Sequence, residues 1–238
     1  MLGDYEVKVY KPEVFDFVVP EGWEELFYEE YETINRIRKS TRARGKSYPL
    51  EREQFTAFYN CPLYKVKVVI LGQDPYPGVQ YLNGELVPHA CGMAFSVKRG
   101  IKVPGSLSNI FLCIKKCYPE YQIPNHGDLT KWANQGILLL NTCLSYFPDN
   151  PLKGPQKRYW GPFVDKVIET VCRVNPNVIF ILWGKEAQKI PLQGKIERLE
   201  GIHPSPQNGK QFVETVDHFR VINEKLSKLG IEEIDWSL

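Results

Sequence analysis

The sequence predicts an α/β protein with a single domain, in which a central, mainly parallel four-stranded sheet is flanked by helices on both faces. Three observations support this prediction: four apolar runs have the length of strands, segments with helical spacing lie between and after them, and the runs are almost continuously apolar. Continuous apolar runs are typical of strands that are buried on both faces. Alternation of strands and helices favours parallel strands joined by crossover helices.

The first half of the chain predicts helices and then a strand. Apolar residues recur at helical spacing over residues 23–38, and we expect this helix to lead into a basic loop over residues 36–46. A short helical piece containing Phe55 and Phe58 comes next. The four predicted strands cover residues 66–71, 137–140, 178–183 and, more weakly, 196–202.

The remaining helices are predicted between and after these strands. They cover residues 106–117, 129–134, 163–174 and 212–229. Ser106 is a plausible N-cap of the first of them, and Gly230 ends the last. Residues 78–89 are punctuated by Gly and Pro and fit neither pattern, so we expect a loop there.

Composition is that of an ordinary globular protein, with 238 residues, 43% hydrophobic and 24% charged. It excludes disordered, collagenous and repeat classes. Charge is unevenly distributed, because residues 1–32 hold ten acidic residues and two lysines, whereas the remainder holds 28 basic and 18 acidic residues. We expect residues 1–20 to form an extension and residues 21–238 the domain. A basic body fits a polyanionic partner, although an acidic helix face beside a mildly basic surface explains the charge as well.

The sequence also predicts where the protein works. No stretch approaches the roughly 18 consecutive apolar residues of a spanning helix, and the first six residues lack the features of a signal peptide. Six cysteines are scattered through apolar segments. This usage favours buried thiols over a disulfide framework, so we expect an intracellular, reducing compartment, no disulfides and no contact with membranes.

Polar clusters follow each predicted strand. These clusters are residues 72–77, 141–142, 184–186 and 203–206. Ligands of parallel sheets bind beyond the carboxyl ends of the strands, so several clusters at one edge indicate a site, although any single one could be an ordinary turn or helix cap.

The residues of this edge suit a planar heterocycle. They supply a carboxylate (Asp74), an imidazole (His203), a carboxamide (Asn141) and two aromatic rings (Tyr76 and Phe95). A carboxamide can pair with a base edge, and an aromatic ring can stack on its face. Neither G-x-x-x-x-G-K-[ST] nor G-x-G-x-x-G is present, which argues against a nucleoside triphosphatase or a dinucleotide enzyme.

Three of these segments carry a resemblance to a known family. Gly72-Gln73-Asp74-Pro75-Tyr76, the run from Gly136 to Asn141, and His203-Pro204-Ser205-Pro206 resemble the signature motifs of the family 1 uracil-DNA glycosylases. The likeness extends from residue 23 to residue 236 in the family's order. It implies an enzyme that flips uracil out of DNA and hydrolyses its bond to deoxyribose, leaving an abasic site for base excision repair, without metal or cofactor.

The resemblance implies roles for six residues of the pocket. Asp74 orients the attacking water and favours the oxocarbenium-like sugar, and neutral His203 donates a hydrogen bond to the uracil oxygen that becomes negative. Asn141 makes paired hydrogen bonds to the base, which cytosine would leave unmatched. Phe95 stacks on uracil, Tyr76 occupies the space that a thymine methyl needs, and Gln73 lines the pocket. Taken singly, each of these residues could instead be a turn, cap or core residue.

The positions that would contact phosphates and the duplex match the family pattern less well. The resemblance assigns Ser106 and Ser205 to phosphates, with Lys185 after the third strand, although serine in a turn is often a local cap. Pro77 stands where the family usually has His, Gln207 where it has a wedging leucine, and Lys185 where it has serine. The segment of residues 78–89 is longer than the family pattern leads us to expect between Tyr76 and Phe95.

These departures motivate the hypothesis that single-stranded or weakly paired uracil is favoured more strongly than in leucine-bearing relatives. We expect a monomer that acts on single- and double-stranded uracil-containing DNA, with a proteinaceous inhibitor or replication partner left open. The sequence also allows two alternatives. One is a non-enzymatic DNA-binding module on the same fold, and the other is a metal-dependent hydrolase that uses Asp74, His126, Asp128 and His203. The latter lacks recognisable ligand spacing.

Overall fold

A four-stranded parallel sheet forms the centre of the molecule in the computed structural model, which describes residues 15–149 and 154–238. Its strands, in the order β4-β1-β7-β8, are β4 (Ile137–Asn141), β1 (Val68–Gly72), β7 (Ile179–Trp183) and β8 (Glu197–Gly201). All three neighbouring pairs are parallel. Every residue of β1, β4 and β7 is buried, because helices cover both faces of the sheet. The predicted fold class is therefore confirmed.

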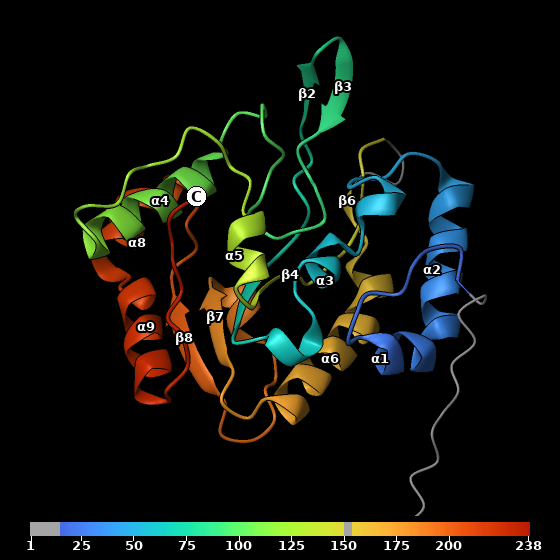
Figure 1. Cartoon of the computed structure of the whole chain (residues 1–238). Coiled ribbons are helices and arrows are strands. Elements are labelled where there is room, and N and C mark those ends of the chain that lie inside the picture. The colour runs from blue at the N-terminus through green and yellow to red at the C-terminus, as the bar shows by residue number, and fades with distance from the viewer. Residues whose placement is uncertain (1–14, 150–153) are drawn as a thin grey trace, which may run out of the picture.

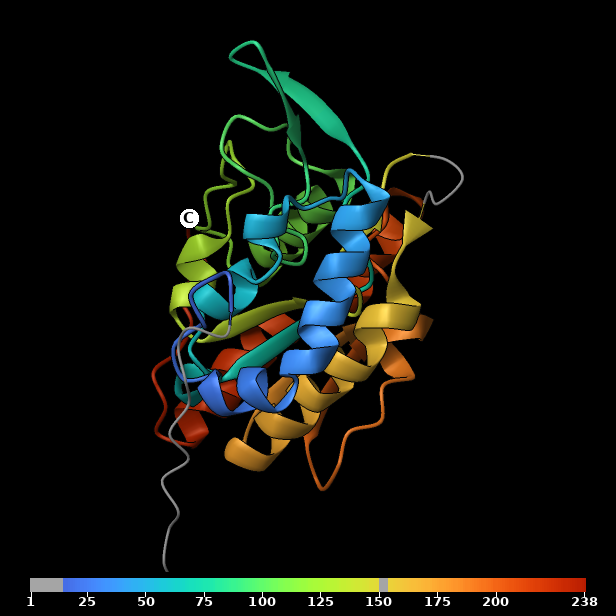
Figure 2. The ribbon, with the colours of Figure 1, turned by 90° about the vertical axis from the view of Figure 1, so that its right-hand side faces the viewer.

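Two groups of helices lie on opposite sides of the sheet (Figure 1). The first group is α1 (Glu24–Glu29), α2 (Tyr31–Arg44) and α6 (Lys157–Val174). The second group is α4 (Gly105–Cys117), α8 (Gly209–Thr215) and α9 (His218–Lys228). The shorter helices are α3 (Thr56–Tyr59), α5 (Thr130–Asn134), α7 (Lys185–Gln188) and the 3-10 turns Glu51–Glu53, Leu63–Lys65 and Pro206–Asn208. Figure 2 shows the first group in front of the strands.

Aromatic rings fill the space beneath the first group of helices. The Phe27 ring lies 5.0 Å from Phe55, 5.4 Å from Phe58 and 5.6 Å from Phe163, in edge-to-face geometry. Such pairs add roughly 0.5–1.5 kcal/mol each beyond the area that they bury. This cluster links α1, α3 and α6 into one layer.

Three helix predictions were wrong in their boundaries. Helix α6 begins at Lys157, six residues before its predicted start. The segment over residues 23–38 forms two helices, and α2 continues to Arg44, so the predicted basic loop is mostly helix. Arg38 explains the continuation, because it is only 5% exposed and forms ion pairs with Asp16 at 3.2 Å and Glu51 at 2.8 Å. The predicted helix over residues 212–229 is broken at Val216, which is extended and buried in the core.

Residues 78–89 form a β-hairpin, so the predicted loop was also wrong. Strand β2 (Val79–Leu82) pairs antiparallel with β3 (Glu85–Pro88). Asn83 and Gly84 make the turn with φ values of 52° and 84°. Asn-Gly between two short strands is a strong hairpin signal, and this signal was overlooked in the sequence.

Four further observations concern a small strand pair, the cysteines, the absence of membrane-spanning helices among the described residues and the N-terminal boundary. A short antiparallel pair, β5 (Tyr146–Phe147) and β6 (Gly154–Pro155), was not predicted. All six cysteines are unpaired. None of the helices in the described residues is long and apolar enough to cross a membrane. The division after residue 20 stays a prediction: residues 1–14 lie outside the described part, and Phe15 packs 6.5 Å from Phe27.

Candidate active site

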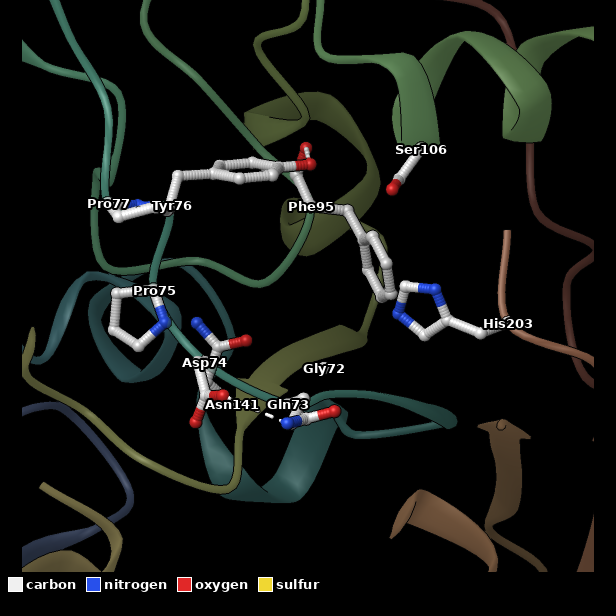
Figure 3. A pocket seen from close by; sticks show the side chains of 10 residues that line it. All are labelled: Gly72, Gln73, Asp74, Pro75, Tyr76, Pro77, Phe95, Ser106, Asn141 and His203. Atoms are coloured by element: carbon white, nitrogen blue, oxygen red, sulfur yellow. Dashed lines mark hydrogen bonds between the residues drawn. The ribbon is translucent and has the colours of Figure 1, made fainter. Parts of the chain in front are cut away.

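A pocket of about 240 Å³ opens at the carboxyl edge of the sheet (Figure 3). Residues after β1, the last residue of β4 and a residue after β8 meet there, as expected of a parallel sheet. The lining residues are Gly72, Gln73, Asp74, Pro75, Tyr76, Pro77, Phe95, Ser106, Asn141 and His203. Segments more than 130 residues apart in the sequence therefore contribute to one small cavity.

Gly72 and Asn141 form the floor of the pocket. They are partners in the register of β1 and β4. A Cβ on Gly72 would overlap the Asn141 side-chain oxygen and would lie 2.7 Å from the Cβ of Ala94. Asn141 is 9% exposed, and its carboxamide has no hydrogen-bond partner among the described residues. A carboxamide that lines the pocket without a protein partner is available to a ligand that can both donate and accept.

The carboxylate of Asp74 is partly buried and lies near one cation. Lys157 Nζ, at the start of α6, lies 3.8 Å from Asp74 Oδ1, and Gln73 Nε2 donates to Oδ2 at 3.0 Å. Oδ1 is buried and accepts no hydrogen bond among the described groups. Burial raises the pKa of Asp74 above its ordinary value, while the Lys157 charge and the Gln73 hydrogen bond oppose that rise.

Two aromatic rings form the wall of the pocket opposite Asp74. The Tyr76 hydroxyl donates to the Phe95 carbonyl at 3.4 Å, and burial raises the pKa of Tyr76, which keeps it protonated. Phe95 has a φ of 64°, which is uncommon for a residue other than glycine. Its ring meets Trp183 edge to face at 5.7 Å and lies 6.3 Å from the His203 ring. This geometry leaves the Phe95 ring at the pocket surface, where a planar base can stack.

His203 approaches the pocket from the segment after β8. Burial lowers its pKa, so the imidazole is neutral around pH 7. Its carbonyl accepts from Asn208 Nδ2 at 3.3 Å. Gly184 lies behind it with a φ of 89°, and a Cβ there would be 3.0 Å from His203 Cβ. A neutral imidazole can donate one hydrogen bond without bringing a positive charge into the pocket.

Asn109 of α4 fixes the His203–Pro206 segment. Its Nδ2 donates to the carbonyl of Pro204 at 2.9 Å and to that of Ser205 at 3.3 Å. This positioning role was missed in the sequence, although Asn109 lies in one of the segments that carry the resemblance. Lys157 was missed as well, because nothing in its local sequence indicates that it approaches Asp74.

The structure brings together seven of the ten predicted site residues. Those that line the pocket are Gln73, Asp74, Tyr76, Phe95, Ser106, Asn141 and His203. Ser106 lies inside the first turn of α4, whose N-cap is Pro104 without a capping side chain, so its predicted capping role was wrong.

The other three predicted residues lie outside the pocket. Lys185 is exposed at the first position of α7, Gln207 is exposed in the turn Pro206–Asn208, and Ser205 is partly buried. Their assignment to DNA stays a prediction.

The four ligands of the metal alternative do not converge. Asp74 and His203 line the pocket described above, whereas Asp128 lines a separate cavity of about 340 Å³, where it lies 3.6 Å from Arg99. Over residues 15–149 and 154–238, no group of three or more His, Cys, Asp or Glu side chains could hold a metal ion. The proposed ligand set is therefore wrong in its geometry.

Comparison with known proteins agrees with this geometry. The family model of the uracil DNA glycosylase superfamily matches residues 58–227. The uracil-DNA glycosylase of Dichelobacter nodosus (strain VCS1703A) is 35% identical over 230 residues, covering 92% of this chain and 96% of the relative. That of Aliivibrio fischeri (strain ATCC 700601 / ES114) is 39% identical over 210 residues, covering 87% and 90%.

Solved structures show the same relationship. The crystal structure of mimivirus uracil-DNA glycosylase has a TM-score of 0.79 at 29% identity and covers 91% of this chain and 86% of its own. A mimivirus UNG variant in complex with UGI has a TM-score of 0.84 at 28% identity, covering 97% and 92%. Since the family model spans more than half of the chain and the curated relatives cover most of it, this chain belongs to the uracil-DNA glycosylase superfamily.

Proposed function

We propose that Asp74 and His203 carry out the reaction of this uracil-DNA glycosylase, which hydrolyses the bond between uracil and deoxyribose in DNA and leaves an abasic site for base excision repair. One observation carries the assignment: a carboxylate, a neutral imidazole and an unpartnered carboxamide meet in one pocket of about 240 Å³. Pockets for drug-sized ligands occupy roughly 300–1,000 Å³, so this one suits a single flipped base.

Asn141 selects the base in this proposal. Its carboxamide accepts from and donates to the edge of uracil, while cytosine presents the opposite pattern and leaves buried groups unpaired. Each such mismatch costs about 1–3 kcal/mol. Phe95 stacks on the ring, Tyr76 excludes the thymine methyl, and Gln73 lines the entrance beside Asp74.

Asp74 and His203 act on opposite charges of the transition state. The Asp74 carboxylate orients a water molecule and stabilises the positive charge that develops on the sugar as the bond breaks. His203, which is neutral because burial lowers its pKa, donates to the uracil oxygen that becomes negative. The two groups line the same pocket, so the leaving base and the sugar are stabilised together.

DNA contacts surround the pocket. Ser106 lines it, and we assign Ser106, Ser205 and Lys185 to phosphates and Gln207 to the space that the flipped nucleotide vacates. A polar amide gains less from apolar burial than a leucine wedge, and Pro77 offers no side-chain donor. These features support a stronger preference for single-stranded or weakly paired uracil than leucine-bearing relatives have.

Partners and compartment follow from the same features. We infer a monomer that acts on single- and double-stranded DNA in an intracellular, reducing compartment, where six unpaired thiols are stable. The complex of the mimivirus relative with UGI motivates a test for a proteinaceous inhibitor or other protein partner on the pocket face.

The test is uracil release from end-labelled oligonucleotides with one uracil, single-stranded or paired with A or G, in the presence of EDTA. Alkali then cleaves the abasic sites. We expect uracil-dependent cleavage, no cleavage of thymine controls, and loss of cleavage in Asp74→Asn. Full activity of Asp74→Asn would refute the catalytic assignment. Equal rates on all three substrates, unchanged by Gln207→Leu, would refute the strand preference.

A further inference from the structure

The β2–β3 hairpin, residues 79–88, has two chemically different faces. Cross-strand partners share a face, so Val79 and Tyr81 lie with their partners Pro88 and Leu86 on one side, which we call the outer face. Gln80 and the residues that alternate with the outer face lie on the other side.

The inner face is fastened to the body of the protein. Gln80 Nε2 donates to the Gly100 carbonyl at 3.0 Å, and Gln80 Oε1 accepts from the Lys102 backbone N–H at 3.0 Å. The Leu82 side chain lies so close to Gly100 that a Cβ there would be 2.8 Å from Leu82 Cδ1. These contacts fix the direction in which the hairpin projects.

The outer face is apolar and open to solvent. Tyr81 is 74% exposed, Leu86 45% and Val79 37%. Among the described hydrogen bonds, none involves the Tyr81 hydroxyl. Contiguous exposed apolar side chains are uncommon on proteins without a partner at that surface.

The hairpin lies close in sequence to residues of the uracil pocket on both sides. Pro77, which lines the pocket, lies two residues before β2, and the chain that leaves β3 returns to the pocket at Phe95. The hairpin projects beyond the carboxyl edge of the sheet (Figure 1). Four residues per strand extend roughly 13 Å, which is the span of a few nucleotides. A DNA strand with one nucleotide in the pocket can therefore bring a base a few nucleotides further along to Tyr81.

Charge near the hairpin also fits a DNA strand. The loop that anchors the inner face carries three basic residues, Lys98, Arg99 and Lys102, around Gly100. Lys98 and Arg99 have acidic partners, whereas Lys102 has no ion pair among the described residues, and the Arg99 side chain is 68% exposed. Basic groups at the base of the hairpin can contact the phosphates of a strand whose bases stack on the outer face.

We propose that Tyr81, supported by Val79 and Leu86, stacks on an unpaired base of the substrate strand a few nucleotides from the flipped uracil. The inference rests on the proposed function, because it takes the pocket as the uracil site. In this proposal the hairpin binds the DNA strand and so compensates for the weak contact that Gln207 makes in place of a leucine. Base–aromatic stacking of this kind is sequence-tolerant, so the contact adds affinity and no base preference.

The experiment measures binding of the full-length chain to a single-stranded 15-mer with a non-hydrolysable 2′-fluoro-deoxyuridine at its centre. In a series of such oligonucleotides, 2-aminopurine replaces one base at each position up to five nucleotides on either side. We expect Tyr81→Ala to raise Kd about tenfold and to abolish quenching of 2-aminopurine at one or two positions. Tyr81→Trp should preserve both.

A matched control and a short substrate sharpen the test. Tyr64 is also exposed, at 61%, but precedes β1 and so lies at the amino edge of the sheet, and Tyr64→Ala should leave Kd unchanged. On a trinucleotide with uracil in the middle, Tyr81→Ala should release uracil at the wild-type rate, because the substrate ends before the hairpin.

Unchanged Kd and quenching in Tyr81→Ala, whether or not the outer face binds a protein instead, would overturn the proposal. Failure of the proposed function looks different, since the wild type would then release no uracil from the trinucleotide. Equal melting temperatures of Tyr81→Ala and wild type would show that the variant folds.

Discussion

The interior and the carboxyl edge of the same strands contrast sharply. Within β4, Leu138, Leu139 and Leu140 are fully buried among apolar neighbours. One residue later, Asn141 is almost as buried but leaves its carboxamide without a partner among the described residues. Burial at the first three positions stabilises the fold, whereas the fourth position presents a carboxamide to the pocket, where a ligand can bind it.

The same contrast holds for β1. Val68 to Leu71 are buried, and Asp74 follows three residues later with one oxygen that is buried and accepts no hydrogen bond among the described groups. Unsatisfied polar groups are rare in native proteins and concentrate at functional sites. Substitutions in the interior should therefore change stability, and substitutions at the edge should change activity.

The largest effect is expected for Asp74→Asn. Because the variant removes the negative charge that faces the developing sugar cation, uracil release should slow by roughly 10²–10³-fold or more in single-turnover assays. Its melting temperature should equal or exceed that of the wild type, since a half-buried charge is removed.

Asp128→Asn is the matched control for this variant, because Asp128 lines the separate cavity and an amide oxygen can still accept from Thr130. Its rate should lie within about twofold of the wild type. A loss below tenfold for Asp74→Asn would contradict the comparison between interior and edge.

A substitution in the interior should do the reverse. Leu139→Ala leaves a cavity in the centre of β4 and should lower the free energy of unfolding by about 2–5 kcal/mol, measured by urea denaturation. The rate of uracil release by the folded fraction should stay near that of the wild type. Leu112→Ala, at an exposed position on α4, should change stability by less than about 0.5 kcal/mol.

Gly72→Ala should affect both regions, because Gly72 lies where interior and edge meet. The methyl group would overlap the Asn141 carboxamide, so kcat/KM should fall roughly 10- to 100-fold through misplacement of Asn141. Gly161→Ala is the control: it lies in α6 with no atom within 4 Å of its added Cβ and should be neutral or stabilising. Wild-type kcat/KM for Gly72→Ala would exclude Asn141 as a base contact.

The smallest effect is expected for Lys157→Met and depends on pH. Burial raises the pKa of Asp74 and Lys157 lowers it, so removal of the cation should raise that pKa further. Less carboxylate is then ionised in acid, and the acid limb of the kcat/KM profile should move to higher pH, with a loss of several-fold on that limb and no loss well above it.

Three other titratable groups lie near Asp74. Burial raises the pKa values of Tyr76 and Cys143, so both stay neutral where the carboxylate ionises, and it lowers the pKa of His203. Lys157→Arg keeps the charge and should restore the limb. Coincident profiles for Lys157→Met and the wild type would show that the ammonium does not influence Asp74.

Much of the fold was predictable because the strands are strongly apolar. Each of the four strands of the central sheet lies within two residues of its predicted bounds, since burial on both faces requires an uninterrupted apolar run. Helix boundaries were less predictable. The continuation of α2 depends on buried Arg38 and its partners Asp16 and Glu51, which lie far from it in the sequence or in another element.

The sequence by itself determined the strand order along the chain, the chemistry at the strand ends and, through its motifs, the family. Only the tertiary structure decided that Lys157 approaches Asp74, that Asn109 holds the segment after His203, and that Tyr81 faces solvent. The physical reason is the separation of the interacting residues along the sequence. Apolar periodicity is written into neighbouring residues, whereas a contact between a helix start and a loop about 80 residues away exists only once the sheet brings them together.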